Sequence, residues 1–476
     1  MTTILSVASE CAPLVKTGGL ADVAGALPGA LAGEGCEMRT LLPGYRAVLA
    51  RMDGAAEVAR FDDLFGGPAR LLFAQVGPLA LYAIEAAHLY DREGGPYLDP
   101  QGRDWADNPE RFAALAWVAA HIATHGAGDW RPEVVHGHDW QAGFTPEYMH
   151  AMGARVPFVM TIHNVAFHGN VEPGRIGSLG LDPWRFRQEH FEYWGQVSAL
   201  KAGLTGADRI TTVSRTYAHE LLTDAFGMGM EGVLRARKGV LSGIVNGIDT
   251  DAWNPATDPA LAATYSTPRG KAANTAALRA EFGLPDDAPG PLCVLVSRLS
   301  GQKGIDLLIE ALPALLERGG QLALLGSGDP HLESLLKDYA ATHPGVAVKI
   351  GYDEALSHRM MAGGEAILVP SRFEPCGLTQ LYGLRYGTVP LVALTGGLAD
   401  TVINASPAAL ARGVATGVQF FPIDALSLGN ALAQLCDLYA DPKTWATLQR
   451  NGMKQPVGWE TSAAAYAALY AELVTG

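Results

Sequence analysis

The stretch PLCVLVSRLSGQKGIDLLIEALPALLERGGQLALLGSG, residues 291–328, indicates the fold class of the C-terminal half of the chain. It contains a short apolar run (291–298), an amphipathic helical period that ends at glycine (304–319), and a second apolar run (321–328). Short apolar runs that alternate with helical periods are typical of βαβ units in a parallel sheet. The stretch therefore predicts a parallel α/β domain with right-handed crossovers.

The same alternation extends in both directions from this stretch. Toward the C-terminus we expect helices at 331–343, 354–364 and 377–387 and strands at 346–353, 366–371 and 389–394. In the N-terminal half we expect a hairpin at 71–85, a helix at 109–126, and strands at 3–9, 38–43, 133–138, 157–164, 209–214 and 241–247. The fold class predicted is α/β, with two Rossmann-like, doubly wound domains.

A loop-rich segment, NGIDTDAWNPATDP (246–259), separates the two halves. We place the boundary near Asn246–Asn254, which gives an N-terminal domain of 1–245 and a C-terminal domain of 246–456. The last amphipathic segment, about 457–476, either packs on the C-terminal domain or crosses back to the first domain. We assign it to the N-terminal domain.

Composition narrows the class of protein. The chain has 476 residues, of which 48% are hydrophobic, and its formal net charge is −14. This is globular composition, and the acidic balance argues against a nucleic-acid partner. The five scattered cysteines suggest neither disulfides nor a zinc site. The N-terminus lacks a basic leader and no long apolar run occurs, so we expect a cytoplasmic protein with no membrane partner.

The hexapeptide TGGLAD occurs twice, at 17–22 and at 395–400. Each copy follows a predicted strand and opens a predicted helix, so each presents glycines where doubly wound folds bind ligands. In the first copy, Lys16 precedes Gly18 and Gly19 at the mouth of the helix, an arrangement that suits an anion. The alternative is an ordinary turn with a solvated lysine. We expect the two sheet edges to face each other across a deep cleft.

Charged residues follow two strands of the C-terminal domain. Arg298 and Lys303 lie on one loop after a strand, where two cations suit a diphosphate. Glu374 precedes a turn, and Gly377–Thr379 opens a helix, so a carboxylate for sugar hydroxyls lies beside a helix N-terminus for phosphate. Solvated cations and an ordinary helix cap are the alternatives. The GxGxxG pattern at 326–331 is incomplete, which disfavours a nicotinamide enzyme.

Polar residues also end two strands of the N-terminal half. His136, His138 and His163 lie at separate strand ends without a carboxylate triad, so we expect hydrogen-bonding groups rather than metal ligands. Asp139 and Trp140 indicate a sugar-binding contact, because they place a carboxylate beside an aromatic ring on which a sugar can stack.

Seven motifs resemble, in order, those of the bacterial glycogen synthases, a family of ADP-glucose-dependent glucosyltransferases: KTGGLADVAGALP (16–28), HGHDW (136–140), TIHN (161–164), VNGID (245–249), SRLSGQKG (297–304), SRFEPCGLTQLYG (371–383) and TGGLADTV (395–402). The resemblance implies the GT-B fold. It implies transfer of glucose, with retention, from ADP-glucose to the 4-OH at the non-reducing end of glycogen or a malto-oligosaccharide. It implies no cofactor and no metal, and it leaves the oligomeric state open.

The resemblance also implies roles for individual residues. Arg298 and Lys303 would bind the diphosphate, joined by Lys16, Gly18 and Gly19 from the other domain. Glu374 would bind the glucose hydroxyls, Tyr352 would stack on adenine, and His163 would lie near the anomeric carbon. The further substrate-binding residues implied are Asp22, Asp139, Trp140, Asn164, Asn246, Cys376, Gly377, Leu378 and Thr379, with Glu10 and Tyr97 on the acceptor side.

One position departs from the wider GT-B pattern. Many retaining members carry a second glutamate eight residues after the first, as the ribose contact, and this chain has Tyr382 there. We therefore assign no ribose contact. Three other functions remain as alternatives: a UDP-glucose-dependent transferase, a glycogen phosphorylase (which needs a longer chain and a pyridoxal phosphate lysine), and a non-catalytic sugar-binding protein.

Overall fold

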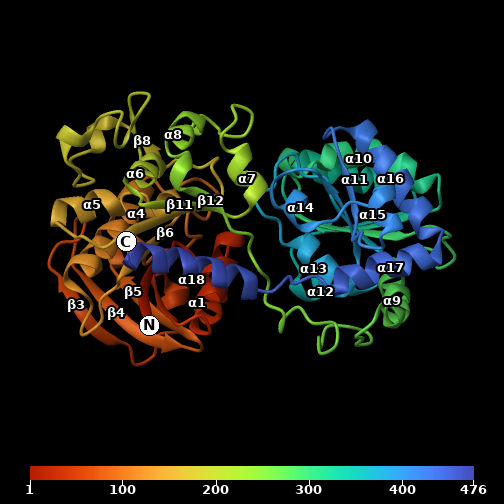
Figure 1. Ribbon diagram of the computed structural model, residues 1–476, viewed down its shortest axis with the longest axis horizontal. Coiled ribbons are helices and arrows are strands. Elements are labelled where there is room, and N and C mark those ends of the chain that lie inside the picture. The colour runs from red at the N-terminus through yellow and green to blue at the C-terminus, as the bar shows by residue number, and fades with distance from the viewer. Residues whose placement is uncertain (476) are drawn as a thin grey trace. The chain divides into compact units, whose positions relative to one another are not determined.

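The computed structural model describes residues 1–475, and within them the chain divides into two compact units. Unit 1 comprises Met1–Asn246 together with the chain from Trp459 onward, and unit 2 comprises Gly247–Gly458. Each unit has its own sheet, parallel throughout in unit 2 and mostly parallel in unit 1, with helices packed on it (Figure 1). The doubly wound α/β prediction is confirmed for both.

Unit 1 contains a nine-stranded sheet in the order β12-β11-β7-β6-β1-β2-β5-β4-β3. Neighbouring strands are parallel from β12 to β5, and β4 and β5 form the predicted hairpin. Strand β3 was not predicted because it is an exposed edge strand with little apolar character. The strands are β1 (Thr2–Val7), β2 (Cys36–Pro43), β3 (Ala56–Phe61), β4 (Ala69–Val76), β5 (Leu79–Glu85), β6 (Val134–His138), β7 (Phe158–Ile162), β11 (Arg209–Thr212) and β12 (Leu241–Gly243).

Helices and a small second sheet complete unit 1. The helices are α1 (Gly19–Ala32), α2 (Arg46–Leu49), α3 (Ala87–Tyr90), α4 (Asn108–His125), α5 (Thr145–Met152), α6 (Ala199–Gly206), α7 (Arg215–Glu220), α8 (Glu231–Ala236) and α18 (Glu460–Thr475). The second sheet is built from β8 (Asn170–Val171), β9 (Glu192–Tyr193) and β10 (Gln196–Ser198). Helix α18, blue in Figure 1, packs against α1, red, although more than 400 residues separate them in the sequence. Its aromatic face joins the core beneath the sheet.

Unit 2 contains a six-stranded parallel sheet in the order β15-β14-β13-β16-β17-β18. The strands are β13 (Leu292–Val296), β14 (Gln321–Gly326), β15 (Val346–Ile350), β16 (Ala366–Val369), β17 (Val389–Ala393) and β18 (Val418–Phe420). The helices are α9 (Ala272–Phe282), α10 (Ile305–Leu316), α11 (Pro330–Thr342), α12 (Glu354–Gly363), α13 (Thr379–Tyr386), α14 (Gly396–Thr401), α15 (Pro407–Ala411), α16 (Ala425–Tyr439) and α17 (Pro442–Met453). The predicted strands all form, and β18 is the one the apolar pattern did not reveal.

The strand order in each sheet reverses beside its first strand. In unit 1 the reversal lies between β1 and β6, and in unit 2 it lies between β13 and β16. At such a point the connections leave in opposite directions and open a crevice at the carboxyl ends of the strands. Each unit therefore has one place where its topology favours a ligand. The helices within residues 1–475 include none that is long and apolar enough to cross a membrane.

Candidate functional site

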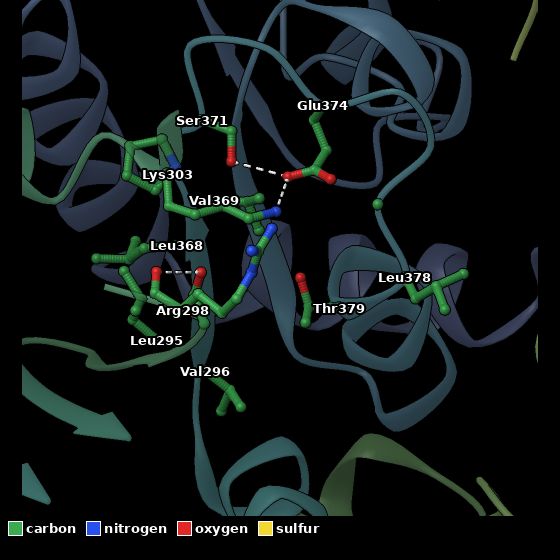
Figure 2. Close-up of a pocket in the computed structure, with 13 residues that line it drawn as sticks. Leu295, Val296, Arg298, Lys303, Leu368, Val369, Ser371, Glu374, Leu378 and Thr379 are labelled. Carbon is green, nitrogen blue, oxygen red and sulfur yellow. Dashed lines mark hydrogen bonds and ion pairs between the residues drawn. The ribbon is translucent and has the colours of Figure 1, made fainter. Parts of the chain in front are cut away.

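The crevice of unit 2 is a pocket of about 190 Å³ at the carboxyl ends of β13 and β16 (Figure 2). Both charged loops predicted from the sequence reach it. Its polar lining includes Ser371, which was not predicted as a site residue although it lies two positions after β16, the strand that ends at the pocket. The lining residues are Leu295, Val296, Ser297, Arg298, Lys303, Leu368, Val369, Pro370, Ser371, Glu374, Gly377, Leu378 and Thr379.

Lys303 and Glu374 form an ion pair inside this pocket, with both side chains largely buried. Ser371 Oγ donates a second hydrogen bond to the same Glu374 oxygen, Oε2, at 2.9 Å. Lys303 and Glu374 were predicted to bind different parts of a ligand, and the structure brings these two side chains together. A ligand that takes up either group must therefore compete with, or share, this pair.

Arg298 differs from Lys303 in its surroundings. It is exposed, and its side chain points toward the Lys303–Glu374 pair (Figure 2). Its guanidinium makes no ion pair within the part of the chain that the structure describes. Arg298 therefore offers a fork of N–H donors to an incoming anion, the geometry that recognises phosphate oxygens in a bidentate manner.

The third wall of the pocket is the turn that leads into α13. Gly377 has a φ of 71°, which favours glycine, and the helix begins at Thr379. Leu378 and Thr379 line the pocket, so the first N–H groups of α13 lie beside the cationic side chains. Cys376 is buried and does not line the pocket, so the prediction that it contacts the ligand is not supported. Tyr352, 76% exposed, lies outside the lining on the loop after β15.

The corresponding edge of unit 1 carries the first TGGLAD copy. Gly18 and Gly19 are exposed, and a side chain added to either would meet nothing within 4 Å. Lys16 is not a free cation, because its Nζ donates to Asp22 Oδ1 at 2.7 Å. Glu10 Oε2 accepts the backbone N–H groups of Thr17 and Gly18. A carboxylate of the protein therefore occupies the Gly18 N–H, one of the backbone donors that the sequence suggested for an external anion, together with the N–H of Thr17.

The second TGGLAD copy has a different role from the one predicted. Gly396 and Gly397 are buried, and a Cβ at Gly396 would approach the Glu374 carbonyl oxygen to 2.0 Å. At Gly397 it would approach the Cys376 carbonyl oxygen to 2.2 Å. These glycines allow the start of α14 to pack against the backbone of the Glu374 loop. The side-chain positions of these two glycines therefore face the protein's own loop, whereas those of Gly18 and Gly19 are open.

Asp139 directly follows β6 at the crevice of unit 1. Its backbone has a φ of 53°, which a non-glycine residue rarely adopts. Its Oδ1 accepts the backbone N–H groups of His163, at 2.7 Å, and of Asn164, at 3.3 Å. Burial raises the pKa of this carboxyl to about 7, although the two hydrogen bonds oppose the rise. Strain and a shifted pKa at a strand end are typical of functional sites.

Two other predicted residues of unit 1, Trp140 and Asn246, are also partly or fully buried. Trp140 is half-buried and packs edge-on against Phe112, with ring centroids 5.1 Å apart. Asn246 is buried, and within residues 1–475 its side-chain oxygen has no hydrogen-bond partner. A buried amide oxygen without a partner is costly in a folded protein, so it marks a place where a ligand or water is expected to donate.

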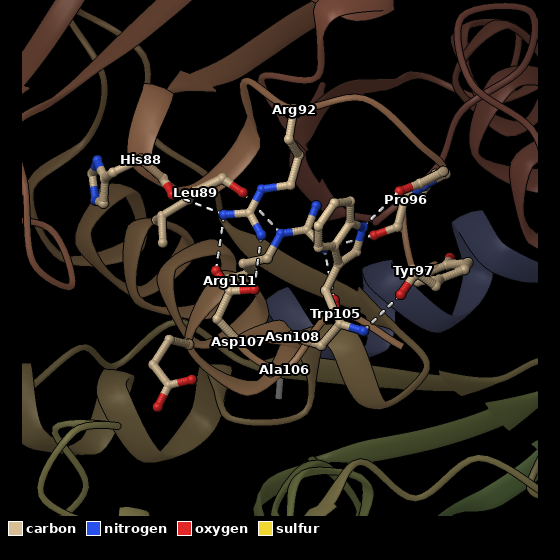
Figure 3. Close-up of polar contacts among 12 residues, drawn as sticks. His88, Leu89, Arg92, Pro96, Tyr97, Trp105, Ala106, Asp107, Asn108 and Arg111 are labelled. Carbon is tan, nitrogen blue, oxygen red and sulfur yellow. Dashed lines mark hydrogen bonds and ion pairs between the residues drawn. The ribbon is translucent and has the colours of Figure 1, made fainter. Parts of the chain in front are cut away.

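Tyr97 reaches this edge from the long loop between α3 and α4. Its hydroxyl donates to Glu10 Oε1 at 2.7 Å. The loop is braced by Arg111, which is buried and donates to the carbonyl oxygen of Pro96 and to Asn108 Oδ1 (Figure 3). Asn108 in turn donates to the Tyr97 carbonyl at 2.9 Å. Arg111 therefore positions Tyr97, a role that no sequence motif indicated.

Comparison with known proteins agrees with this geometry. Residues 3–236 match the family model of the starch synthase catalytic domain, and residues 290–437 match glycosyl transferases group 1. The chain is 67% identical over 470 residues to a glycogen synthase of Jannaschia sp. (strain CCS1) and 62% identical over 471 residues to one of Paracoccus denitrificans (strain Pd 1222). Each alignment covers 99% of both chains.

Solved structures give the same result. The catalytic domain of starch synthase IV from Arabidopsis thaliana, bound to ADP and acarbose, superposes with a TM-score of 0.87 at 30% identity and covers 100% of both chains. A sucrose-phosphate synthase from Thermosynechococcus elongatus shares the fold, with a TM-score of 0.61 at 20% identity and the same coverage of both chains. The fold is therefore the GT-B fold of glycosyltransferases. The chain belongs to the glycogen synthase family and is a glycosyltransferase of glycogen synthesis.

Proposed function

We propose that the chain transfers glucose from ADP-glucose to the non-reducing 4-OH of an α-1,4-glucan, with retention of configuration. The observation that carries the proposal is the pocket of unit 2, where Arg298, Lys303, Glu374 and the start of α13 converge at the point of strand reversal. Two cations and a helix N-terminus suit a diphosphate, and a carboxylate suits sugar hydroxyls. The ADP and acarbose bound to the starch synthase IV relative support the same pair of substrates.

The proposed roles divide between donor and acceptor. Arg298, Lys303 and the backbone of Gly377–Thr379 bind the diphosphate, and Glu374 binds the glucose. Tyr352, which is exposed on the loop after β15, stacks on adenine. From unit 1, Lys16 with Gly18 and Gly19 adds charge to the same diphosphate. His163 binds the glucose, while Asp139, Trp140, Asn164 and Asn246 serve the sugar and acceptor side.

Retention follows from attack on the same face as the departing ADP. A double displacement would need a free carboxylate beneath the anomeric carbon. Asp139 already accepts two backbone N–H groups, and Glu374 is paired with Lys303. We infer instead that a phosphate oxygen of the leaving group takes the proton of the acceptor 4-OH. Catalysis then depends on positioning and on stabilisation of the charge that develops on the diphosphate.

The cationic side chains take the place of a metal ion in this proposal. Residues 1–475 contain no group of three or more His, Cys, Asp or Glu side chains arranged to bind a metal. The decisive assay measures nucleotide release with glycogen present, from ADP-glucose and from UDP-glucose, each with and without EDTA. We expect turnover with ADP-glucose that EDTA leaves unchanged. Faster turnover with UDP-glucose would overturn the donor assignment, and loss with EDTA that manganese restores would overturn the metal assignment.

A further inference from the structure

A chain of buried hydrogen bonds leads from the first strand of unit 1 to His163. Ser6 Oγ, on β1, lies 3.1 Å from His138 Nε2. His138 Nδ1 lies 3.0 Å from His163 Nε2. Ser6 and His138 are at most 1% exposed, and His163 is 9% exposed. Three neighbouring elements, β1, β6 and the end of β7, therefore contribute one polar side chain each to a continuous path.

The two imidazoles of this path are neutral. Burial lowers the pKa of His138 to about 3, and burial also lowers the pKa of His163 well below its usual range. A neutral imidazole carries one N–H and one bare nitrogen. The contact between His138 Nδ1 and His163 Nε2 therefore contains a single hydrogen, and its location fixes the tautomer of both rings.

Ser6 decides between the two possible arrangements. If the hydrogen is on His163 Nε2, then His138 donates from Nε2 to Ser6, and the serine hydroxyl needs an acceptor of its own. Ser6 Oγ has no hydrogen-bond partner other than His138 within the described part of the chain. A buried donor without a partner is disfavoured by about 5- to 150-fold in population.

The opposite arrangement gives both donors of the buried path, Ser6 O–H and His138 Nδ1–H, an acceptor, and the one N–H left over is on His163, the most exposed of the three residues at 9%. Ser6 O–H donates to His138 Nε2, and His138 Nδ1–H donates to His163 Nε2. The single N–H of His163 then lies on Nδ1, which makes no hydrogen bond to any residue from 1 to 475. That nitrogen is left for a ligand.

We propose that Ser6, acting through His138, fixes His163 in the Nδ1–H tautomer, so that His163 presents a hydrogen-bond donor to the substrate. Ser6 and His138 are positioning residues, because they act through His163. The tautomer belongs to the protein alone. Its consequence for catalysis rests on the proposed function: a donor at this place suits an oxygen of the transferred sugar, and a bare nitrogen would not.

A neighbouring network provides a matched control. His136 lies on the same strand as His138, with ring centroids 4.3 Å apart, and is also buried. Its Nδ1 lies 2.7 Å from the Tyr470 hydroxyl, and its Nε2 lies 2.6 Å from Thr161 Oγ1. The variant Tyr470→Phe therefore removes one buried hydroxyl from a histidine, as Ser6→Ala does, without touching the path to His163.

The experiment is a nitrogen-15 NMR spectrum of the full-length protein with labelled histidine, in the absence of substrate. The His163 signals are assigned by their loss in His163→Asn. We expect the wild-type His163 to carry its proton on Nδ1. In Ser6→Ala we expect a second tautomer at one fifth of the population or more, and in Tyr470→Phe we expect none. A wild-type His163 protonated on Nε2 overturns the proposal, even if no variant folds, and so does an unchanged spectrum in Ser6→Ala.

A kinetic comparison then tests which atom of His163 works in the reaction. The amide of asparagine can place an N–H where Nδ1 lies, whereas the amide of glutamine reaches the position of Nε2. We expect kcat of His163→Asn to exceed that of His163→Gln by about tenfold, with the glucan KM within threefold. Equal kcat values would overturn the catalytic consequence. An inactive wild type would refute the proposed function instead, and the NMR result would still decide the tautomer.

Discussion

At the scale of single residues, Asp139 combines strain, burial and a shifted pKa. Its folded pKa of about 7 lies above the value near 4 of an unfolded aspartate. Between these two pH values the unfolded state releases the proton and the folded state keeps it, so the free energy of unfolding falls as pH rises from ~4 to ~7. Below this pH range the folded protein bears no cost for ionising the buried Asp139 carboxyl, and above the range it bears the full cost.

Asp139→Asn should remove this pH dependence. We expect the melting temperature of the variant to exceed that of the wild type by several degrees at pH 8, at roughly 2–4 °C for each kcal/mol regained, and to match it below about pH 4. Thermal unfolding across this range checks the result, with Asp53→Asn, at an exposed position of the same unit, as the control. A constant difference between the two pH extremes would contradict it.

Arg298 and Lys303 should separate catalysis from stability. We expect each glutamine variant, Arg298→Gln and Lys303→Gln, to lower kcat by about 10²–10³, because each substitution removes a donor aimed at the charge that develops on the diphosphate. Arg298→Gln should leave the melting temperature unchanged, since this side chain makes no ion pair among residues 1–475. Lys303→Gln should lower it, because the buried Glu374 would lose its cationic partner and keep only the hydrogen bond from Ser371. Equal melting temperatures, or near-normal kcat in either variant, would argue against this assignment.

Lys16 tests the contribution of unit 1 to the same charge. Its ion pair with Asp22 is solvent-exposed, with side chains 44% and 26% accessible, so its loss should change stability by no more than about 0.5 kcal/mol. We expect Lys16→Gln to lower kcat by about the same factor as Lys303→Gln while donor KM changes little. Steady-state and single-turnover kinetics check this. A near-normal kcat with chemistry rate-limiting would return Lys16 to the role of a solvated lysine.

At the scale of elements, α13 connects the pocket of unit 2 to the segments where the chain enters and leaves this unit. Its first residues line the pocket, and further along Tyr382 stacks on Trp253 with centroids 3.7 Å apart. The Arg385 side chain donates to the carbonyl of Trp253, and Ile248 and Val457 pack together against the helix. Tyr382 therefore serves to anchor the entering segment.

The ends of α12 and α13 are joined by a buried lysine. Lys271 Nζ donates to the carbonyl oxygens of Ala362, at 2.8 Å, and Tyr386, at 3.1 Å, and to Thr388 Oγ1, at 2.8 Å. Burial lowers its pKa to about 7. Lys271→Met would leave the Ala362 carbonyl and Thr388 Oγ1 without this donor, at a cost of about 3 kcal/mol, so we expect the melting temperature of unit 2 to fall by roughly 6–12 °C. Calorimetry measures this change, with Lys337→Met, at an exposed position, as the control. Equal falls in melting temperature in both variants would contradict a stabilising role for the Lys271 hydrogen bonds.

At the scale of the whole molecule, α18 is far in sequence from the rest of unit 1 and yet part of its core. Its residues Tyr466 and Tyr470, together with Trp459 just before the helix, pack with Ile4 and Val134 of the sheet. A chain that ends at Gly458 should therefore lose the cooperative unfolding of unit 1, or shift it down by more than about 10 °C, while unit 2 unfolds as before. Differential scanning calorimetry resolves the two transitions. A chain that ends at Val474 is the control, and an unchanged unit 1 transition in the shorter chain would contradict the packing described here.

The sequence by itself determined the fold class and most of the elements. Buried parallel strands must be continuous apolar runs, and the helices that cross between them must be amphipathic, so the 291–328 stretch and its neighbours were readable without any tertiary information. The same local rules missed β3, an exposed edge strand with little apolar character. The positions of Arg298, Lys303 and Gly377–Thr379 in one pocket were also predictable, because carboxyl ends of parallel strands meet at one edge.

Only the tertiary structure decided how these groups are partnered. The two TGGLAD copies are identical in sequence, yet one is open to solvent and the other packs against the Glu374 loop, because the difference lies in the neighbouring chain. In the same way, Lys303 pairs with Glu374, and Asp139 takes a strained backbone. Ser6 reaches His138 across 132 residues of sequence. A local sequence pattern specifies which side chains can form hydrogen bonds, and the fold specifies which of the possible partners lies within hydrogen-bonding distance.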